Sequence, residues 1–368
     1  MLQHQQEKLF MANLTFKRVF KLALTLLLVG CASEPVQYTA NYPKPQINKP
    51  AIVVPPVRYP GDQPQPGNSG YDDRFSPKRS YHALVLTGTY ANSPQLRRFI
   101  QQMVRKYGFS ETYLNGLFSS AKRLDSVIRL ESPAPSTGPS KPRLGSWTRY
   151  RNKFLTDAHI SNGAQFWRNN ADAIHSASVT YGVDPEYIVG IIGVETYFGK
   201  NFGKTCIFDA LTTLSFATAR RANYFTSELE HFLLMTRDED FDPRQPQGSW
   251  AGAMGYGQFM PSSFRRLAVD FNKDGRRDLW HPKDAVGSVA HYFSRSGWQL
   301  HSPVTKPAGP SNDPAVIELS TYEGSEFWRV YPNFKVIKKY NNSNKYAMAV
   351  HQLAQAIKQR YQQTAGYQ

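Results

Sequence analysis

The feature that most constrains the fold is the stretch 187–194, in which every position is apolar, aromatic or glycine. A helix built from it would have no polar face, so other elements must cover it on all sides. Asp184 and Pro185 precede the stretch, as expected of a capping residue and of proline at the first helical position. Gly199 is suited to end the helix. We therefore predict a fully buried helix in a helical core, with Glu195 in its last turn.

Glu195 is the residue of this helix that could carry out chemistry. Burial disfavours a charged carboxylate, and the negative end of the helix dipole disfavours it again, so both are expected to raise the pKa of Glu195. A carboxyl group that stays protonated near neutral pH can act as a general acid. From the helix position alone, a structural glutamate that is capped or paired with a cation explains the pattern at least as well.

A second pattern is the glycine-rich segment 249–264. Its glycines would let the backbone approach a ligand, its aromatic residues offer faces on which sugars stack, and Gln258 can both donate and accept hydrogen bonds. The segment lacks the Lys-Ser/Thr ending of a phosphate-binding loop and the strand-turn-helix context of a dinucleotide site. On composition, a ligand-binding loop and a plain turn are both consistent with it.

A third pattern, 270–275, matches the opening of an EF-hand calcium loop. Oxygen-bearing side chains stand at positions one, three and five, as Asp270, Asn272 and Asp274, and glycine stands at position six. Position twelve is His281 rather than the usual bidentate glutamate, and three basic residues within 273–277 would oppose a cation. Asp284 could close a longer loop, and a helix over 285–294 would complete the motif. A metal-free turn is the alternative.

Helical periodicity dominates the chain up to residue 235. A helix is predicted to open at Ser93 and Pro94, with Leu96, Phe99, Ile100 and Met103 on its buried face. Further helices are predicted over 110–123, 147–157, 163–181 and 345–363, and a proline-rich loop over 131–146. Short β-like runs at 316–319 and 334–337, among the Pro/Gly-rich turns of 302–340, predict a small β insertion.

The N-terminal region indicates export. Basic residues at 17–21 precede an apolar run over 22–29, which is far shorter than the roughly 20 residues that span a membrane. The run ends in Leu-Val-Gly-Cys, which resembles the lipobox of bacterial lipoproteins. We interpret 1–30 as a lipoprotein-type signal peptide, with an ordinary secretory signal as the alternative. Cys31 would be the acylated first residue, and Ala32 would favour the outer membrane.

Residues 31–80 are rich in proline, glutamine, asparagine and glycine, which predicts a tether between the lipid anchor and the folded part. Acylated Cys31 would leave only Cys206, so no disulfide is expected. The formal net charge of +16 favours an acidic partner. Because no nucleic-acid recognition motif is present and the basic residues are scattered, we predict no binding to nucleic acid.

Several of these segments together resemble the membrane-bound lytic murein transglycosylase B family. The similar segments are ETYFG at 195–199, ATARR at 217–221, GAMGYGQFMPSS at 252–263, the loop at 270–275 and YNNSNKYAMAV at 340–350. The resemblance covers about residues 85–360. It implies a mainly α (α+β) fold: a lysozyme-like helical core, an additional α domain, a small β domain and an EF-hand-like loop.

The resemblance also implies a division of the chain. The signal peptide (1–30) and the tether (31–80) would be followed by an α domain (81–155, completed by a helix over 345–365), the lysozyme-like core (156–301, with the EF-hand-like loop at 270–284) and the small β domain (302–344). The expected partners are peptidoglycan glycan strands, the outer membrane through the lipid anchor, and cell-wall synthesis proteins. A periplasmic monomer is expected.

The implied activity is cleavage of the β-1,4 bond between N-acetylmuramic acid and N-acetylglucosamine, with formation of a 1,6-anhydro product and with Glu195 as sole acid and base. Ser249 and Gln258 would orient the acid and the substrate. The implied groove residues are Arg220, Tyr224, Tyr292, Tyr340, Asn341 and Tyr346, and the implied calcium ligands are Asp270, Asn272, Asp274, the Arg276 carbonyl and Asp284.

Two other functions remain open. A hydrolytic, lysozyme-type muramidase on the same fold would need a second carboxylate about 5–9 Å from the first. Glu228, Glu230 and the acidic run 238–242 are candidates, but each is predicted to lie on a solvated helix face or loop. A catalytically silent peptidoglycan-binding protein is the second alternative.

Overall fold

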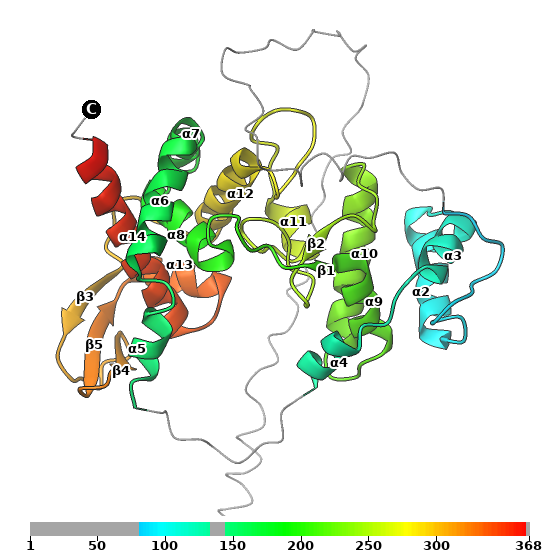
Figure 1. The fold of residues 1–368 in the computed structure, drawn as a ribbon, viewed down its shortest axis with the longest axis horizontal. Coiled ribbons are helices and arrows are strands. Elements are labelled where there is room, and N and C mark those ends of the chain that lie inside the picture. The colour runs from blue at the N-terminus through cyan, green and yellow to red at the C-terminus, as the bar shows by residue number, and fades with distance from the viewer. Residues whose placement is uncertain (1–80, 133–143, 366–368) are drawn as a thin grey trace, which may run out of the picture. The chain divides into compact units, whose positions relative to one another are not determined.

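The computed structural model describes residues 81–132 and 144–365, which belong to one compact unit. The predicted signal peptide, Cys31, the tether and most of the proline-rich loop lie outside the described residues. Figure 1 shows that helices make up most of the described chain, with a small sheet formed by β3, β4 and β5. Within the described residues, no helix is both long enough and apolar enough to cross a membrane.

The elements follow one another with short connections. The helices are α2 (Pro94–Tyr107), α3 (Glu111–Ser119), α4 (Asp125–Glu131), α5 (Ser146–Arg151), α6 (Asp157–Asn169), α7 (Ala171–Tyr181), α8 (Pro185–Thr196), α9 (Ile207–Phe216), α10 (Ala222–Asp238), α11 (Pro261–Leu267), α12 (Pro282–Arg295), α13 (Pro332–Tyr340) and α14 (Asn344–Ala365). The strands are β1 (Thr205–Cys206), β2 (Gln247–Gly248), β3 (Thr305–Ala308), β4 (Val316–Ser320) and β5 (Ser325–Val330).

Both sheets are antiparallel. The larger has the strand order β3-β5-β4, in which Trp328 of β5 stands opposite Pro307 of β3 and Ile317 of β4. The smaller pairs β1 with β2 and so ties the start of α9 to the segment before the glycine-rich loop. The fold is thus mainly α with few strands, as predicted.

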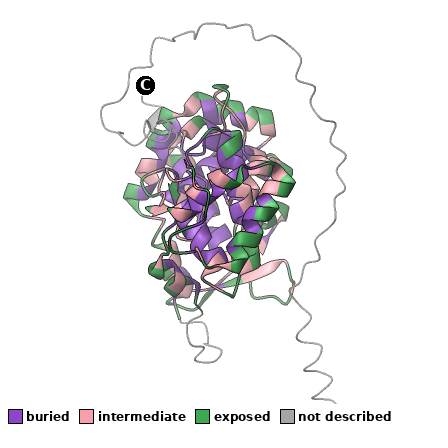
Figure 2. Cartoon of the chain, turned by 90° about the vertical axis from the view of Figure 1, so that its right-hand side faces the viewer, coloured by how far each residue is buried: buried purple, intermediate pink, exposed green. Residues whose placement is uncertain are grey.

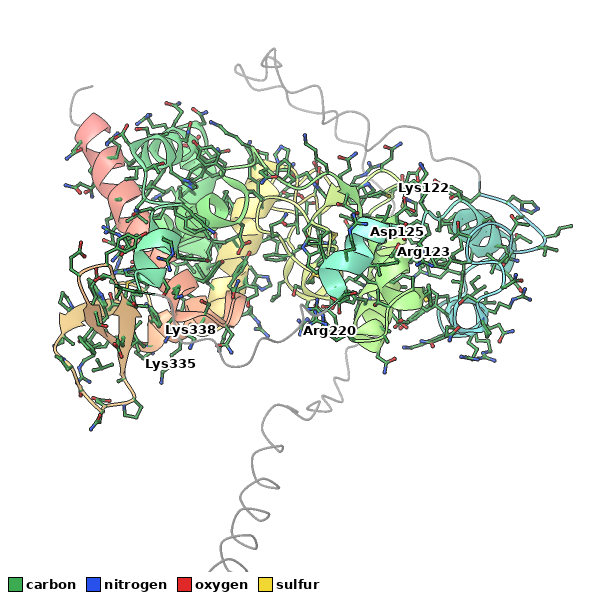
Figure 3. All side chains as sticks on the ribbon, turned by 60° about the horizontal axis from the view of Figure 1, so that its bottom comes forward. Lys122, Arg123, Asp125, Arg220, Lys335 and Lys338 are labelled. Atoms are coloured by element: carbon green, nitrogen blue, oxygen red, sulfur yellow. The ribbon has the colours of Figure 1, made fainter. Side chains whose placement is uncertain are left out.

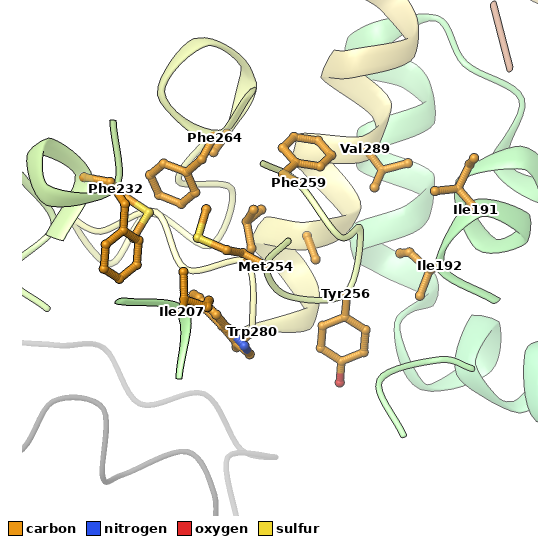
Figure 4. Close-up of a cluster of buried hydrophobic side chains, with 14 of the residues drawn as sticks. Ile191, Ile192, Ile207, Phe232, Met254, Tyr256, Phe259, Phe264, Trp280 and Val289 are labelled. Carbon is orange, nitrogen blue, oxygen red and sulfur yellow. The ribbon is translucent and has the colours of Figure 1, made fainter. Parts of the chain in front are cut away.

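Helix α8 lies at the centre of the core, as its sequence predicts. It contacts α6, α7, α12 and α14, and almost all of its residues are buried. Gly190 makes the close approach to α14 possible, because a Cβ atom there would lie 3.0 Å from Cβ of Ala354. Figure 4 shows Ile191 and Ile192 of α8 within a cluster that continues through Phe259 toward the side chain of Phe232. Figure 2 shows the buried residues, in purple, in the interior of the described chain, and exposed residues, in green, on the outer sides of the helices.

The ends of α8 differ from the prediction. Asp184 stands at the N-cap, but its side chain makes no cap hydrogen bond. Its carboxylate instead accepts a hydrogen bond from Trp298 Nε1 (2.8 Å) and lies 2.9 Å from His301 Nδ1. Asp184 therefore binds residues that are remote in the chain instead of capping its own helix. The helix ends at Thr196, three residues before Gly199, because Tyr197 already has the left-handed backbone conformation.

Other boundaries also required correction. The run 334–337, predicted as β, lies in the helix α13, whose first residue is Pro332 and whose buried face packs on α14. The predicted helix 163–181 is two helices, α6 and α7, separated at Asn170. The helix predicted over 147–157 ends at Arg151. By contrast, α2 opens at Ser93 and Pro94 and buries its four predicted residues, and the inward face of α14 is also as predicted.

Candidate active site

Glu195 lies in the last turn of α8, directly before a turn of left-handed backbone. The φ angles of Tyr197, Phe198 and Gly199 are 52°, 58° and 84°. The turn satisfies the last carbonyls of the helix, because the Tyr197 amide donates to Gly193 O (3.0 Å) and the Phe198 amide donates to Ile192 O (3.3 Å). Two consecutive non-glycine residues in this region are energetically unfavourable, and such strain is common at functional sites.

The carboxyl group of Glu195 is half-buried, and its pKa is strongly perturbed. Burial raises the pKa of Glu195 to about 7, while a hydrogen bond from Tyr346 Oη to Glu195 Oε1 (2.5 Å) acts in the opposite direction. Burial is the larger effect, so the predicted direction is confirmed. Near neutral pH the group is therefore present in both its protonated and its ionised form, as an acid that later acts as a base requires.

Tyrosine side chains surround this carboxyl group. Burial raises the pKa of both Tyr340 and Tyr346 well above the ordinary value, and the negative charge of Glu195 raises it further. The hydroxyl groups consequently stay protonated and can donate hydrogen bonds over the whole working pH range. Tyr150 of α5 is also close enough for the charge of Glu195 to raise its pKa, after burial as the larger cause. The sequence did not single out Tyr150.

The glycine-rich loop is held against α13 by Tyr340, whose hydroxyl donates to Gly257 O at 2.6 Å. A Cβ atom at Gly257 would lie 2.8 Å from that hydroxyl oxygen, so the close approach requires glycine. The ring of Tyr292 lies 4.5 Å from the ring of Tyr340. Three of the predicted groove residues, Tyr292, Tyr340 and Tyr346, are thus brought together around Glu195 and the loop.

Ser249 and Gln258 stabilise the loop itself. Ser249 Oγ accepts a hydrogen bond from the Ala253 amide (3.0 Å), and the Gln258 side-chain amide donates to Gly255 O (3.0 Å) and Phe202 O (3.3 Å). Gln258 has a left-handed backbone with φ of 50°. Within the described residues, neither side chain is hydrogen-bonded to Glu195.

Among the described residues, the side chains of three other predicted groove residues have no hydrogen bond or ring contact with these tyrosines or with Glu195, although Asn341 directly follows Tyr340 in the chain. Arg220 forms an ion pair with the buried Glu131, which Arg221 also binds. Figure 3 shows the side chain of Arg220 beside α4. Tyr224 is 45% exposed, and Asn341 is exposed at the end of α13.

Local patterns missed two residues that support the turn after Glu195. His159 of α6 has Nε2 at 3.0 Å from Gly193 O, and burial lowers its pKa, so the ring is neutral and its N–H donates to the carbonyl. Asn162 Nδ2 donates to the Tyr197 hydroxyl (2.6 Å). The first contact joins α6 to α8 and the second joins α6 to the turn after α8, and no local sequence pattern indicates either of them.

The other acidic residues are less solvated than predicted. Glu228 is buried and accepts hydrogen bonds from the amide and hydroxyl of Ser262 (2.8 and 2.7 Å). Glu239 and Asp242 are buried as well, the first paired with Arg277. The prediction of solvated acids was wrong at these positions, because tertiary partners compensate for their burial. Each of these acids is hydrogen-bonded away from Glu195.

The loop 270–284 brings oxygen side chains together within one turn. Asp270 Oδ1 accepts from the Asp274 amide (3.1 Å), and Asn272 Oδ1 accepts from the same amide (3.0 Å). Asp284 is buried and accepts from three backbone amides, including that of Asn272 (3.0 Å). Carboxylate and amide oxygens are ligands suited to calcium, so the residues fit the ion in type. Among the described residues, no group of three or more His, Cys, Asp or Glu side chains is arranged so that it could hold a metal ion.

We expect Tyr346→Phe to raise the pKa of Glu195 further. The tyrosine hydroxyl stabilises the carboxylate form, so its removal favours the protonated form. An NMR titration of the Glu195 carboxyl carbon measures this pKa directly. Tyr322→Phe, at an exposed tyrosine, is the control and should leave it unchanged. A Glu195 pKa that stays the same or falls in Tyr346→Phe would contradict the assignment of this hydrogen bond.

A mainly helical fold that carries a half-buried carboxyl group with a raised pKa at the end of its core helix is typical of a lysozyme-like enzyme. Comparisons with known proteins agree. The family model described as Transglycosylase SLT domain matches residues 91–315 and 305–355. Membrane-bound lytic murein transglycosylase B of Escherichia coli (strain K12) is 46% identical over 312 residues, covering 75% of this chain and 86% of that protein.

Solved structures show the same similarity. The Escherichia coli lytic transglycosylase SLT35 in complex with calcium has a TM-score of 0.71 and 45% identity, covering 75% of this chain and 96% of that chain. SltB1 from Pseudomonas aeruginosa has a TM-score of 0.68 and 40% identity, covering 73% and 99%. The chain belongs to the transglycosylase SLT family. The prediction of a lytic transglycosylase, an enzyme that acts on peptidoglycan, is confirmed.

Proposed function

We propose that the enzyme cleaves the β-1,4 bond between N-acetylmuramic acid and N-acetylglucosamine and forms 1,6-anhydromuramic acid ends. Glu195 is the sole acid and base in this proposal. The observation that carries it is the half-buried carboxyl group of Glu195, whose pKa is about 7. Such a group can release a proton and take one up again within a single turnover at neutral pH.

In the proposed mechanism, protonated Glu195 first donates its proton to the glycosidic oxygen, and the bond from that oxygen to C1 of the muramic acid breaks. The Glu195 carboxylate then takes the proton from the 6-hydroxyl of the same sugar, whose oxygen forms the new bond to C1. The carboxyl group ends in its starting form, and no water is consumed. The Tyr346 hydroxyl, 2.5 Å from Oε1, would stabilise the carboxylate between the two steps.

The use of one carboxyl group is supported by the placement of the others. Hydrolysing glycosidases generally need a second carboxylate about 5–9 Å from the first. Glu228 is bonded to Ser262 and Glu239 is paired with Arg277, so both are already engaged by structural partners. The hydroxyl groups of the substrate would therefore supply the nucleophile.

The surrounding residues support binding of a glycan. Tyr292, Tyr340 and Tyr346 offer aromatic and hydroxyl groups beside Glu195, and Ser249 and Gln258 shape the loop that would face the sugars. We propose that Arg220 and Tyr224 contact more distant sugar units, and that Asn341 contacts the sugar from its exposed position directly after Tyr340.

The masses of the released muropeptides test this reaction. We expect purified sacculi to yield products with anhydro ends, which are lighter by one water than hydrolysed products. Exclusively water-added products would instead establish the hydrolytic muramidase. Binding to sacculi without any released product would establish the catalytically silent protein.

We also propose that Asp270, Asn272, Asp274, the Arg276 carbonyl and Asp284 hold a structural calcium ion, as a relative of this chain was solved with calcium. The ion would tie the loop to the start of α12. At a calcium concentration about tenfold above its Kd, we expect the free energy of unfolding to rise by about 1.4 kcal/mol. Thermal unfolding with calcium and with a chelator measures it. Asp270→Asn should reduce the response, and identical curves with calcium and chelator would reject the site.

For its location, we propose attachment to the periplasmic face of the outer membrane through lipidated Cys31, with 31–80 as the tether. The relative from Escherichia coli is named as membrane-bound, which supports this placement. Firm anchoring requires more than one acyl chain. We propose a monomer, divided as the sequence suggests into the α domain, the core and the small β domain, with glycan strands and cell-wall synthesis proteins as partners.

A further inference from the structure

A cavity of about 540 Å³ lies outside the surroundings of Glu195, along α14 and beside α5 and β5. These three elements are neighbours in Figure 1. The lining residues are Arg151, Leu155, Trp328, His351, Gln352, Gln355, Ala356, Lys358, Gln359 and Gln362. They do not include the α14 residues whose side chains are in the core, among them Tyr346, Val350 and Leu353. The cavity is therefore lined neither by Glu195 of α8 nor by Tyr346, its hydrogen-bond partner on α14.

Two buried polar atoms of the cavity residues have no hydrogen-bond partner in the part of the chain that the structure describes. They are Arg151 Nε and Gln352 Oε1. A buried donor or acceptor without a partner destabilises the folded state, and the more so when the group is charged. A donor and an acceptor left unsatisfied on two residues that line one cavity favour a ligand that supplies both an acceptor and a donor.

The charge of the cavity comes from Arg151. Lys358 is the other cation in the lining, but it is paired with Glu186 at 2.7 Å. The nearby Glu326 accepts hydrogen bonds from Trp328 Nε1 (3.1 Å) and Trp147 Nε1 (3.3 Å), so its carboxylate is engaged beside the cavity. Within residues 81–132 and 144–365, Arg151 has no ion pair. A carboxylate is the acceptor that suits an unpaired guanidinium best.

The remaining lining suits a peptide. Gln352, Gln355, Gln359 and Gln362 present side-chain amides, which can match the donors and acceptors of a peptide backbone, and Trp328 adds an aromatic surface. His351 contributes no positive charge at neutral pH, since burial lowers its pKa to about 4. A neutral sugar would leave the guanidinium of Arg151 without a charged partner.

We infer that this cavity binds an acidic peptide, with a carboxylate at Arg151 and a backbone N–H at Gln352 Oε1. The identification of that ligand as the peptide part of peptidoglycan rests on the proposed function. Because the cavity is separate from Glu195, a strand could be held through its peptide without occupying the catalytic acid. The site would then retain the enzyme on its substrate between cleavage events.

Isothermal titration calorimetry on the full-length protein tests this inference. The Glu195→Gln background prevents turnover. The probes are acetyl-Ala-Glu-Ala with free carboxylates, the same peptide with both carboxylates amidated, and a peptide-free N-acetylglucosamine tetramer. We expect the acidic peptide to bind at least about tenfold more tightly than its amidated form, because a charged hydrogen-bond pair is lost on amidation.

Two variants assign the site. Arg151→Gln is expected to weaken binding of the acidic peptide about tenfold or more, and Gln352→Met to weaken both peptides without changing their ratio. Arg149→Gln, on the same helix but not in the lining, is the matched control, and binding of the sugar tetramer should change in none of them. Equal binding of acidic and amidated peptides, or equal effects of Arg151→Gln and Arg149→Gln, would overturn the inference. The muropeptide masses test the proposed reaction and the titrations test the peptide site, so the failure of one proposal can be distinguished from the failure of the other.

Discussion

Glu195→Gln is expected to lower the rate of muropeptide release by about 10²–10⁴-fold, the usual contribution of a general acid. Glutamine keeps the shape of the side chain and can still accept the hydrogen bond from Tyr346, but it cannot donate a proton to the glycosidic oxygen. Release from purified sacculi, followed by mass spectrometry, measures the change.

Glu323→Gln, at an exposed glutamate of the turn between β4 and β5, is the matched control and should retain full activity. Retention of activity within about tenfold of the wild type in Glu195→Gln would remove Glu195 from the chemistry. Loss of binding to sacculi in the same variant would instead mean that the groove, and not proton transfer, had been damaged.

The same substitution is expected to stabilise the protein at alkaline pH. The folded-state pKa of Glu195 is about 7 and its ordinary value is 4.5, so folding takes up a proton between these two values. The contribution of Glu195 to stability is therefore largest below about pH 4.5, falls as pH rises towards 7, and stays low above it. The difference of about 2.5 pKa units corresponds to about 3 kcal/mol, which a neutral glutamine would not lose.

Urea unfolding at about pH 8 and about pH 4.5 measures the effect. The free energy of unfolding of Glu195→Gln relative to the wild type should rise by about 3 kcal/mol between the two conditions. Glu323→Gln should follow the wild type at both. A Glu195→Gln variant that is equally or less stable at the alkaline condition would show that the carboxyl group is not kept from solvent.

The parts of the fold that could be predicted are those set by local patterns. The stretch 187–194 has no polar face, and the residues Ser93 and Pro94 form a helix start by themselves, so α8 and α2 follow from neighbouring residues. The run 334–337 shows where this fails. Phe334, Val336 and Ile337 suit a strand or a helix, and packing against α14 selects the helix.

The site divides in the same way. The raised pKa of Glu195 could be predicted from its place in a buried helix. The close backbone contacts of the loop 249–264 could be predicted from its glycines. The contacts of Tyr150, His159 and Asn162 could not, because each joins elements that are remote in the chain. The burial of Glu228 likewise depends on Ser262 of α11, and nothing in the sequence around Glu228 indicates that contact.

The pairing of Glu195 with Tyr346 across 151 residues has a consequence for synthesis. A polypeptide emerges from the ribosome amino end first, so Glu195 emerges before α14 does. Until then α8 lacks the helix that covers one of its sides, and the carboxyl group stays hydrated and ionised. A chain that has not yet produced α14 would therefore lack part of the cover that raises the pKa of Glu195, and with it the protonated form that the proposed reaction needs near neutral pH.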